Sequence, residues 1–382
     1  MPEYLAPGVF VEETPVRARS IAAADQPVTV FVGCTALGPV GSVSPVIASF
    51  AAFKRHYGGL GNLRTGGGRR LVNHVAHAAR CFFAEGGRRL RIVRVSGGDG
   101  RAPSLRGFRS ALRKAHGISG LTTVAAPGSA AIPAVAAGVR QALLDHAARL
   151  GSRCFVLLDP DVAISPVDAA RLAAGLNARA AALYYPWIEV ANPNTRSALM
   201  VPPSGPLAGI VARVDRARGL HRAPANEVIQ TALGLERVLS AAEADRLNPA
   251  GVNALRQFPA RGIRVWGART LSSDPEWKYL NVQRYLGYLE QSVREGLGWA
   301  VFEPNDESLW AATRQAVDAF LYKEWRAGCL VGSRPGQAFF VRCDRSTMTR
   351  ADIGQKRLVI LVGCAPVKPA EFVVLRVTRR TA

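Results

Sequence analysis

Between residues 118 and 190 the sequence alternates apolar runs with helical segments, and this pattern constrains the fold more than any other feature of the chain. The apolar runs have the length of strands and read GLTTVAAPG, RCFVLLDPD and AALYYPWIEV; between them lie an alanine-rich segment over 131–149 and the segment SPVDAARLAAGLNAR. Strands that are apolar at every position are buried on both faces, as in a parallel sheet that helices cover on both sides. The sequence therefore predicts an α/β domain with a largely parallel sheet.

The chain has 382 residues, more than one ordinary hydrophobic core accommodates, so we expect at least two domains. The α/β domain is expected over 21–260. A second domain, of α+β class, is expected over 261–365 and begins with the predicted strand RGIRVWGART. Extended arms are expected at the two ends, over 1–20 and 366–382.

The best-defined helix of the second domain is predicted over 306–326. Asp306 and Glu307 lie in its first turn and Lys323 and Arg326 in its last, which matches the helix dipole. One stripe of this helix is largely apolar and comprises Leu309, Thr313, Ala316, Val317, Phe320 and Leu321. The opposite face is largely polar and carries Arg314, Asp318, Tyr322 and Arg326.

Each arm contains a short run of mostly apolar and β-branched residues next to prolines, the pattern of an isolated strand. The first run is PGVFVEETP, between Pro7 and Pro15, and the second covers Glu371 to Thr378 after Pro366 and Pro369. A single strand at a chain end exposes unpaired backbone groups. We therefore expect each run to pair with a sheet elsewhere.

The formal net charge is +21, and much of it lies in one segment. Between Arg64 and Lys114 there are 13 Arg and Lys residues against two acids, so this segment contributes +11. Such a basic field attracts polyanions and acidic protein surfaces, and it is equally consistent with a solvated basic surface. Because no nucleic-acid-binding motif accompanies the charge, no nucleic-acid partner is expected. Residues 60–118 are predicted to be a poorly defined basic segment that is irregular over 97–118.

The sequence carries no signal for export or membrane insertion. The N-terminal MPEYLAPGVFVEE is acidic where a signal peptide is basic, and no run of about 18 apolar residues predicts a membrane span. We therefore expect the chain to remain in the cytoplasm of the producing cell, without direct membrane insertion. The six cysteines are scattered and form no C-x-x-C pair, which predicts reduced, buried thiols.

Two features of the sequence are similar to ligand-binding motifs but do not match them. The glycine-rich segment 58–68 has Arg64 where the third glycine of G-x-G-x-x-G would stand, and it lacks the lysine of a phosphate-binding loop. His74 and His77 lie three residues apart on a predicted helix, but no other metal-ligating residue accompanies them at suitable spacing. A plain loop and a packing or surface role are the favoured interpretations.

Candidate catalytic residues are equally isolated. Ser204 is not part of a G-x-S-x-G motif. Asp159 and Asp161 follow a predicted strand, where catalytic acids often occur in α/β folds, but an Asp-Pro pair is also ordinary turn chemistry. The sequence therefore predicts a protein that is not an enzyme and needs no cofactor.

Long motifs, concentrated between residues 183 and 310, carry a family resemblance. They read LYYPWIEV, PPSGPLAGIVARVDRARGLHRAPAN, LNPAGVNALRQFPARGIRVWGARTLSSDPEWKYLNVQRYL and VFEPNDESLW, and they continue in AFFVRCDRSTMT, GCAPVKPAEFVVLRV and the N-terminal YLAPGVFVEE. Over about two-thirds of its length the chain resembles the tail sheath proteins of contractile phage tails and related contractile injection particles. Residues 60–118 match least.

The resemblance implies a structural role without catalysis or cofactor. Sheath subunits stack as rings, usually hexameric, around an inner tube protein, and the partners expected besides the tube are further copies of the chain and the baseplate and terminal cap proteins. Each subunit's arms add strands to a sheet in a neighbour's C-terminal domain, and the extended array contracts to drive the tube through a target envelope. The exchanged residues are then expected to be Pro7, Gly8, Val9, Phe10, Val11, Phe372, Val373, Val374, Leu375, Arg376 and Val377.

The polar face of the helix over 306–326 is a candidate for the tube contact. We expect Arg314, Asp318 and Arg326 to meet an acidic tube surface; the alternative is that this face meets solvent or another sheath subunit. For the whole chain the alternative function is a basic nucleic-acid-binding protein, which a salt-dependent gel shift would distinguish. The resemblance is shared by the sheaths of phage tails, phage-derived bacteriocins and injection systems, and it applies to the extended and the contracted state of the sheath alike.

Overall fold

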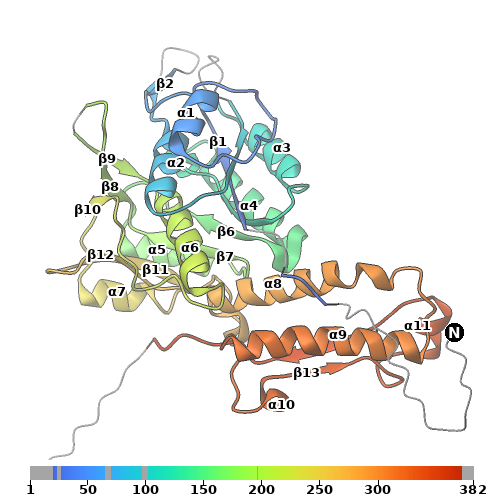
Figure 1. The fold of residues 1–382 in the computed structure, drawn as a ribbon. Helices are drawn as coiled ribbons and strands as arrows, with labels where there is room; N and C mark the ends of the chain where they lie inside the picture. Colours follow the sequence, from blue (N-terminus) through green and yellow to red (C-terminus); the bar gives the residue numbers. More distant parts are fainter. Residues whose placement is uncertain (1–19, 24–26, 65–69, 97–101, 196, 372–382) are drawn as a thin grey trace, which may run out of the picture. The chain divides into compact units, whose positions relative to one another are not determined.

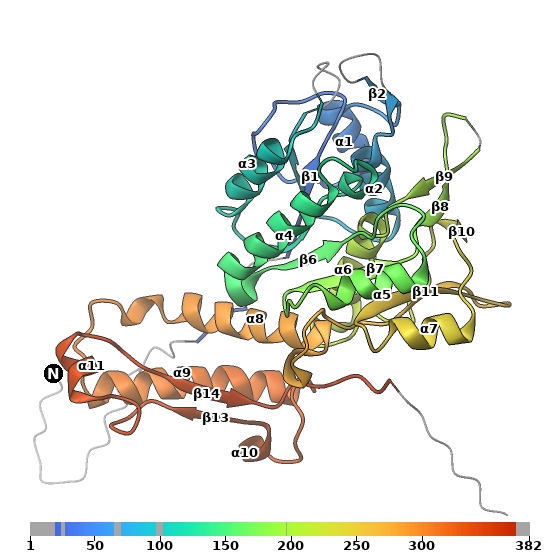
Figure 2. The ribbon, with the colours of Figure 1, turned by 180° about the vertical axis from the view of Figure 1, so that it is seen from behind.

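The protein is described by a computed structural model over residues 20–23, 27–64, 70–96, 102–195 and 197–371. It divides into two compact units, whose elements are drawn in Figure 1 and, from behind, in Figure 2. The large unit comprises Ala23–Ser292 and Pro366–Ala382, and the small unit comprises Met1–Ala22 and Val293–Ala365.

The large unit is built on a seven-stranded sheet. From one edge to the other its strands are β12 (Gly262–Trp266), β11 (Val252–Phe258), β7 (Ala181–Tyr185), β6 (Phe155–Leu158), β5 (Leu121–Ala125), β1 (Val28–Gly33) and β4 (Leu90–Arg94). All neighbours in this order are parallel except β12, which runs antiparallel to β11. The prediction of an α/β domain with a largely parallel sheet is confirmed.

Helices cover both faces of this sheet (Figure 1). One face packs against α3 (Leu105–Ala115), α4 (Ala136–Leu150), α5 (Pro166–Ala174) and α7 (Ala241–Leu247). The other packs against α1 (Phe50–Tyr57), α2 (His74–Ala84), α6 (Ser204–Arg218) and the first residue of α8 (Leu280–Gly296). Successive strand residues point to opposite faces, so Val30 belongs to the first hydrophobic cluster and Phe31 to the second. Both are fully buried, which explains why the strands read as continuous apolar runs.

Two smaller sheets complete the large unit. A three-stranded antiparallel sheet has the order β10 (Ala232–Leu235), β8 (Ile188–Ala191) and β9 (Ala198–Val201), and β2 (Leu63–Arg64) pairs with β3 (Arg70–Leu71). Ile188, Val190 and Val201 are buried in the second hydrophobic cluster, so the three-stranded sheet shares the core of the large one.

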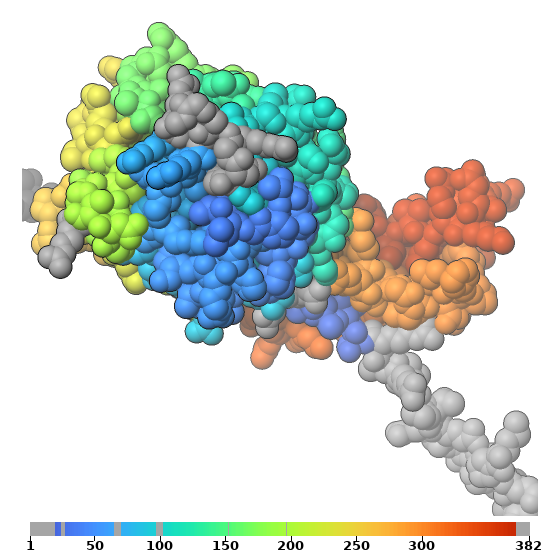
Figure 3. Space-filling model, turned by 90° about the horizontal axis from the view of Figure 1, so that it is seen from above, coloured from blue at the N-terminus to red at the C-terminus, as the bar shows by residue number. Residues whose placement is uncertain are grey.

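The basic segment contains more regular structure than the sequence indicated. The prediction of an irregular stretch over 97–118 is wrong for α3, whose N-terminus is capped by Ser104: its hydroxyl accepts a hydrogen bond from the N–H of Gly107 at 3.2 Å. The buried stripe of α3 consists of Phe108, Ala111, Leu112 and Ala115. Exposed basic residues interleave with this stripe and obscure its periodicity in the sequence. Residues 102–118, coloured turquoise in Figure 3, form part of the surface of the large unit.

The boundary between the units differs from the predicted one at residue 261. The strand β12, which was expected to begin the second domain, pairs with β11 and belongs to the large sheet. The second segment of the small unit instead begins at Val293, within α8. The described part of the C-terminal segment, residues 366–371, groups with the large unit, although residues 366–382 were predicted as a separate arm.

The small unit is organised around α9 (Glu307–Arg326). The Asp306 side chain caps this helix by accepting a hydrogen bond from the N–H of Leu309 at 2.9 Å, and the predicted apolar stripe is buried. The helix contacts β13 (Phe339–Arg342), which pairs with β14 (Leu361–Cys364). Two short helices, α10 (Pro335–Ala338) and α11 (Arg350–Gly354), complete the unit. None of the helices in the described ranges is long and apolar enough to cross a membrane.

Candidate assembly surfaces

The two-stranded sheet of the small unit has unpaired edges. β13 and β14 are antiparallel, with Phe339 opposite Cys364 and Arg342 opposite Leu361. No third strand joins them among the residues that the structure describes. Each strand therefore presents an edge whose N–H and C=O groups can pair with a further strand.

One face of this sheet exposes two large apolar side chains. Phe340 and Leu361 lie on the face opposite the buried Phe339, and these residues are 47% and 49% exposed. The Phe340 ring covers Gly363 so closely that a Cβ at this glycine would lie 2.2 Å from it, and the Arg342 guanidinium lies 5.4 Å from the ring centroid. Apolar side chains of this size next to an open strand edge are typical of an interaction surface.

The last described residues of the chain are bound to the large unit. The Nε of Arg269 donates a hydrogen bond to one carboxylate oxygen of Glu371 at 2.7 Å, and its Nη2 forms an ion pair with the other. The Tyr279 hydroxyl lies 3.3 Å from the same carboxylate and the Lys278 ammonium 3.7 Å. These contacts, led by the hydrogen bond from Arg269, lower the pKa of Glu371 below its usual range. The segment 366–371 therefore has a defined position on the large unit.

The predicted tube-facing residues are exposed in the small unit. Arg314, Asp318 and Arg326 lie on α9 at intervals of four and eight residues, on the face opposite its buried stripe. Exposure makes them accessible to a partner, and their role in binding a tube stays a prediction. The predicted exchange residues of both arms lie outside the described ranges.

Of the two histidines singled out in the sequence, His77 lies in the core and His74 is half-buried. His74 and His77 are on α2, and the rings of His74 and Trp187 meet edge-on with centroids 5.4 Å apart. Burial and the neighbouring His77 lower the pKa of His74 to about 4, so this side chain is neutral at pH 7. Across the described ranges, no three His, Cys, Asp or Glu side chains are grouped so that they could hold a metal ion.

The candidate catalytic residues make structural contacts. Asp159 follows β6 and lies beside Ser204, the first residue of α6. Asp161 forms an ion pair with Arg140 at 3.2 Å. Both aspartates thus connect the carboxyl end of a strand to a helix of the same unit, which agrees with the structural interpretation of the Asp-Pro turn.

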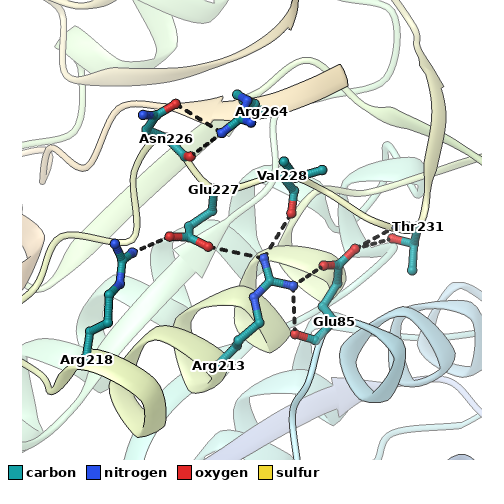
Figure 4. Close-up of polar contacts among 8 residues, drawn as sticks. All are labelled: Glu85, Arg213, Arg218, Asn226, Glu227, Val228, Thr231 and Arg264. Atoms are coloured by element: carbon teal, nitrogen blue, oxygen red, sulfur yellow. Dashed lines mark hydrogen bonds and ion pairs between the residues drawn. The ribbon is translucent and has the colours of Figure 1, made fainter. Parts of the chain in front are cut away.

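A buried ion-pair network, which the sequence did not indicate, joins α2, α6 and the segment before β10 (Figure 4). The Glu85 side chain is fully buried; one carboxylate oxygen accepts a hydrogen bond from Arg213 at 2.9 Å, and the other accepts two from Thr231 at 2.8 and 2.9 Å. Arg213 also binds Glu227 and the carbonyl oxygen of Val228, at 3.4 and 2.9 Å. Glu85 counts in the sequence only as one of two acids in a basic segment, so no local signal identifies its partners.

Family models match most of the chain. The phage tail sheath protein central domain matches residues 114–271, and the phage tail sheath C-terminal domain matches residues 272–380. Among curated proteins, the tail sheath protein of Burkholderia phage BcepMu is 29% identical over 160 residues, which are 39% of this chain and 33% of that protein. The matched stretches span about half or less of the length of the curated relatives.

Solved structures resemble the chain over nearly its full length. The sheath of the PVC extracellular contractile injection system in its contracted state has a TM-score of 0.79 and 26% identity, covering 100% of this chain and 99% of that one. The helical sheath of the anti-feeding prophage (AFP) in its contracted state has a TM-score of 0.77 and 29% identity, covering 99% and 100%. The two family models and the shared fold establish that this chain belongs to the phage tail sheath protein family.

Proposed function

We propose that this chain is the structural subunit of a contractile tail sheath, which polymerises helically around an inner tube and contracts to drive the tube through a target envelope. The observation that carries the proposal is the β13–β14 sheet, which has unpaired edges among the described residues and exposes Phe340 and Leu361. Proteins that resemble the chain over nearly its whole length form the sheaths of contractile particles, which supports the same role.

Exchange of strands joins the subunits in this proposal. The N-terminal run Pro7–Val11 and the C-terminal run Phe372–Val377 each add to an edge of the β13–β14 sheet in a neighbouring copy, as in β-augmentation. Each main-chain hydrogen bond contributes about 0.5–1.5 kcal/mol net, so a few residues of pairing on two edges hold neighbours firmly. Donor and acceptor are different surfaces, so the contact is heterologous and propagates along a helix.

The remaining partners follow from this arrangement. The exposed face of α9, with Arg314, Asp318 and Arg326, binds the tube. Baseplate and terminal cap proteins lie at the two ends of the polymer. Contraction is a rigid-body change between two packings of the subunits, during which the exchanged strands stay paired. The finished particle is a phage tail, a bacteriocin or an injection device.

Deletion of residues 372–382 tests the proposal. The truncated subunit should remain folded, as judged by its thermal unfolding, but should form no sheath in electron micrographs and sediment as a monomer. Deletion of residues 379–382 alone is the matched control, because these residues follow the predicted strand, and this variant should still assemble. Long sheaths formed by the protein that lacks 372–382 would rule out donation of the C-terminal strand.

A further inference from the structure

We infer that Arg269, Tyr279 and Asn281 form a C-terminal anchor, a site on the large unit that holds residues 366–371 and sets where the donated strand begins and in which direction it leaves. The inference rests on the proposed strand exchange for its functional meaning. It also shortens the predicted strand, Glu371 to Thr378, by one residue. Glu371 is then the last residue of the anchor contact, and the strand starts at Phe372.

The carboxylate of Glu371 is held at two points. Its two oxygens face the Nε and Nη2 of Arg269, a bidentate pairing that fixes orientation as well as position. The Arg269 side chain is 8% exposed and that of Glu371 15%. An ion pair this well shielded is weakened little by salt, and either partner left alone would be an uncompensated buried charge.

Contacts within the large unit orient Arg269 independently of residues 366–371. The Nη1 of Arg269 donates a hydrogen bond to the carbonyl oxygen of Asn248 at 2.8 Å, and its backbone N–H donates one to the side chain of Asn253 at 2.6 Å. Asn253 is 1% exposed and lies in β11; its amide also donates to the carbonyl oxygens of Leu183 at 3.2 Å and of Arg269 at 2.8 Å. The central sheet therefore orients the guanidinium toward Glu371.

A second contact fixes the direction of the backbone. The amide of Asn281 donates hydrogen bonds to the carbonyl oxygen of Val367 at 3.0 Å and to that of His221 at 2.8 Å, and Asn281 is 1% exposed. Because the segment is held at both Val367 and Glu371, four residues apart, its direction is fixed as well as its position. By contrast, Lys368 and Glu276 are 3.4 Å apart with side chains 46% and 77% exposed, so this pair contributes little.

The anchor limits the part of the chain that must be ordered when a neighbour binds. Without it, the donated segment would begin at Pro366; with it, the eleven residues 372–382 remain. A binding-competent conformation populated in only a fraction of subunits raises the apparent dissociation constant by the inverse of that fraction. Pre-ordering of residues 366–371 therefore lowers the subunit concentration at which sheath forms.

The test compares Glu371→Ala with Lys368→Ala in the full chain. Below the concentration of assembly, hydrogen exchange over 366–371 should accelerate in Glu371→Ala and not in Lys368→Ala, the matched control on the same segment. The concentration needed for sheath formation should rise about tenfold in Glu371→Ala if one subunit in ten keeps its segment in place. Glu371→Gln retains a hydrogen-bond acceptor for Arg269 and should lie between Glu371→Ala and the wild type, which guards against an effect of general unfolding.

The outcomes separate the anchor from strand exchange. If Glu371→Ala assembles at the wild-type concentration, or exchanges like the wild type over 366–371, the anchor is overturned; strand exchange still stands if deletion of 372–382 abolishes the sheath. If that deletion leaves assembly intact, donation of the C-terminal strand fails by itself, whatever the hydrogen exchange of Glu371→Ala.

Discussion

Asp159 caps α6 through the first residue of that helix, Ser204. One carboxylate oxygen of Asp159 accepts a hydrogen bond from the backbone N–H of Ser204 at 2.9 Å, and the other accepts one from its hydroxyl at 2.7 Å. The residue before the helix, Pro203, offers no side-chain cap. Both Asp159 and Ser204 are buried, so these bonds satisfy groups that water cannot reach.

Substitution of Asp159 should separate its capping role from its charge. Asp159→Ala leaves the N–H of Ser204 unpaired in the core and should lower the free energy of unfolding by about 1–3 kcal/mol, measured with urea. Asp159→Asn keeps an acceptor for the N–H and should be much milder. An equal loss in both variants would contradict a capping role.

Asp159 should also make the stability of the protein depend on pH. Burial raises the pKa of Asp159 to about 7, although the bonds from Ser204 oppose the shift. Between about pH 4 and 7 the folded protein keeps a proton that the unfolded chain has released, so the contribution of this residue to stability falls as pH rises. The wild type should therefore lose stability relative to Asp159→Asn when the pH is raised from 5 to 8. A constant difference would place the pKa outside this range.

The buried ion pair between Glu85 and Arg213 should be costly to break. Glu85→Ala leaves the Arg213 side chain, 19% exposed, without its main partner and the Thr231 donors without an acceptor. We expect a loss of about 3–5 kcal/mol in the free energy of unfolding of the large unit. The control is Glu307→Ala, which breaks the exposed pair with Arg345 and should change stability little. Similar effects of the two variants would contradict this ranking.

His146 should contribute to acid denaturation. Burial, with smaller effects of His116 and Arg149, lowers its pKa to about 4. Between pH 6.5 and 4 the unfolded chain binds a proton that the folded protein does not. The free energy of unfolding therefore decreases as the pH is lowered, by up to about 1.4 kcal/mol per pH unit. His146→Leu should reduce this slope, whereas the same change at the exposed His56 should not. Urea unfolding at pH 7, 6 and 5 measures the slopes; an unchanged slope in His146→Leu would refute the prediction.

Charge reversal on α9 tests the proposed tube contact. Arg314→Glu with Arg326→Glu should abolish tube-loaded particles while empty sheath still forms, because the reversed charges repel an acidic tube surface. Reversal of two exposed arginines on α3, Arg106 and Arg113, is the control and should leave loading unchanged. Electron microscopy of the particles distinguishes filled from empty sheath. Normal loading in the α9 variant would mean that this face meets solvent or another subunit.

The elements that sequence reasoning found are those whose signals are local. The helix α9 has its cap at Asp306 and its buried stripe within the same twenty residues. The parallel sheet was predictable because strands such as β6 are apolar at every position, and burial on both faces demands this. α3 was missed because basic residues interrupt its stripe, and β12 was assigned to the second domain because a strand's partner is not recorded in its own residues.

What the sequence determined by itself is the class of the fold, the position of the helices and strands with a clear apolar pattern, and the family. Only the tertiary structure decided which polar groups meet: Asp159 with Ser204 across 45 residues, Arg269 with Glu371 across 102, and Glu85 with Arg213 across 128. Apolar periodicity is a property of neighbouring residues and can be read along the chain. A buried carboxylate is stable only beside its donors, and folding supplies these from segments whose spacing in the sequence carries no trace of the contact.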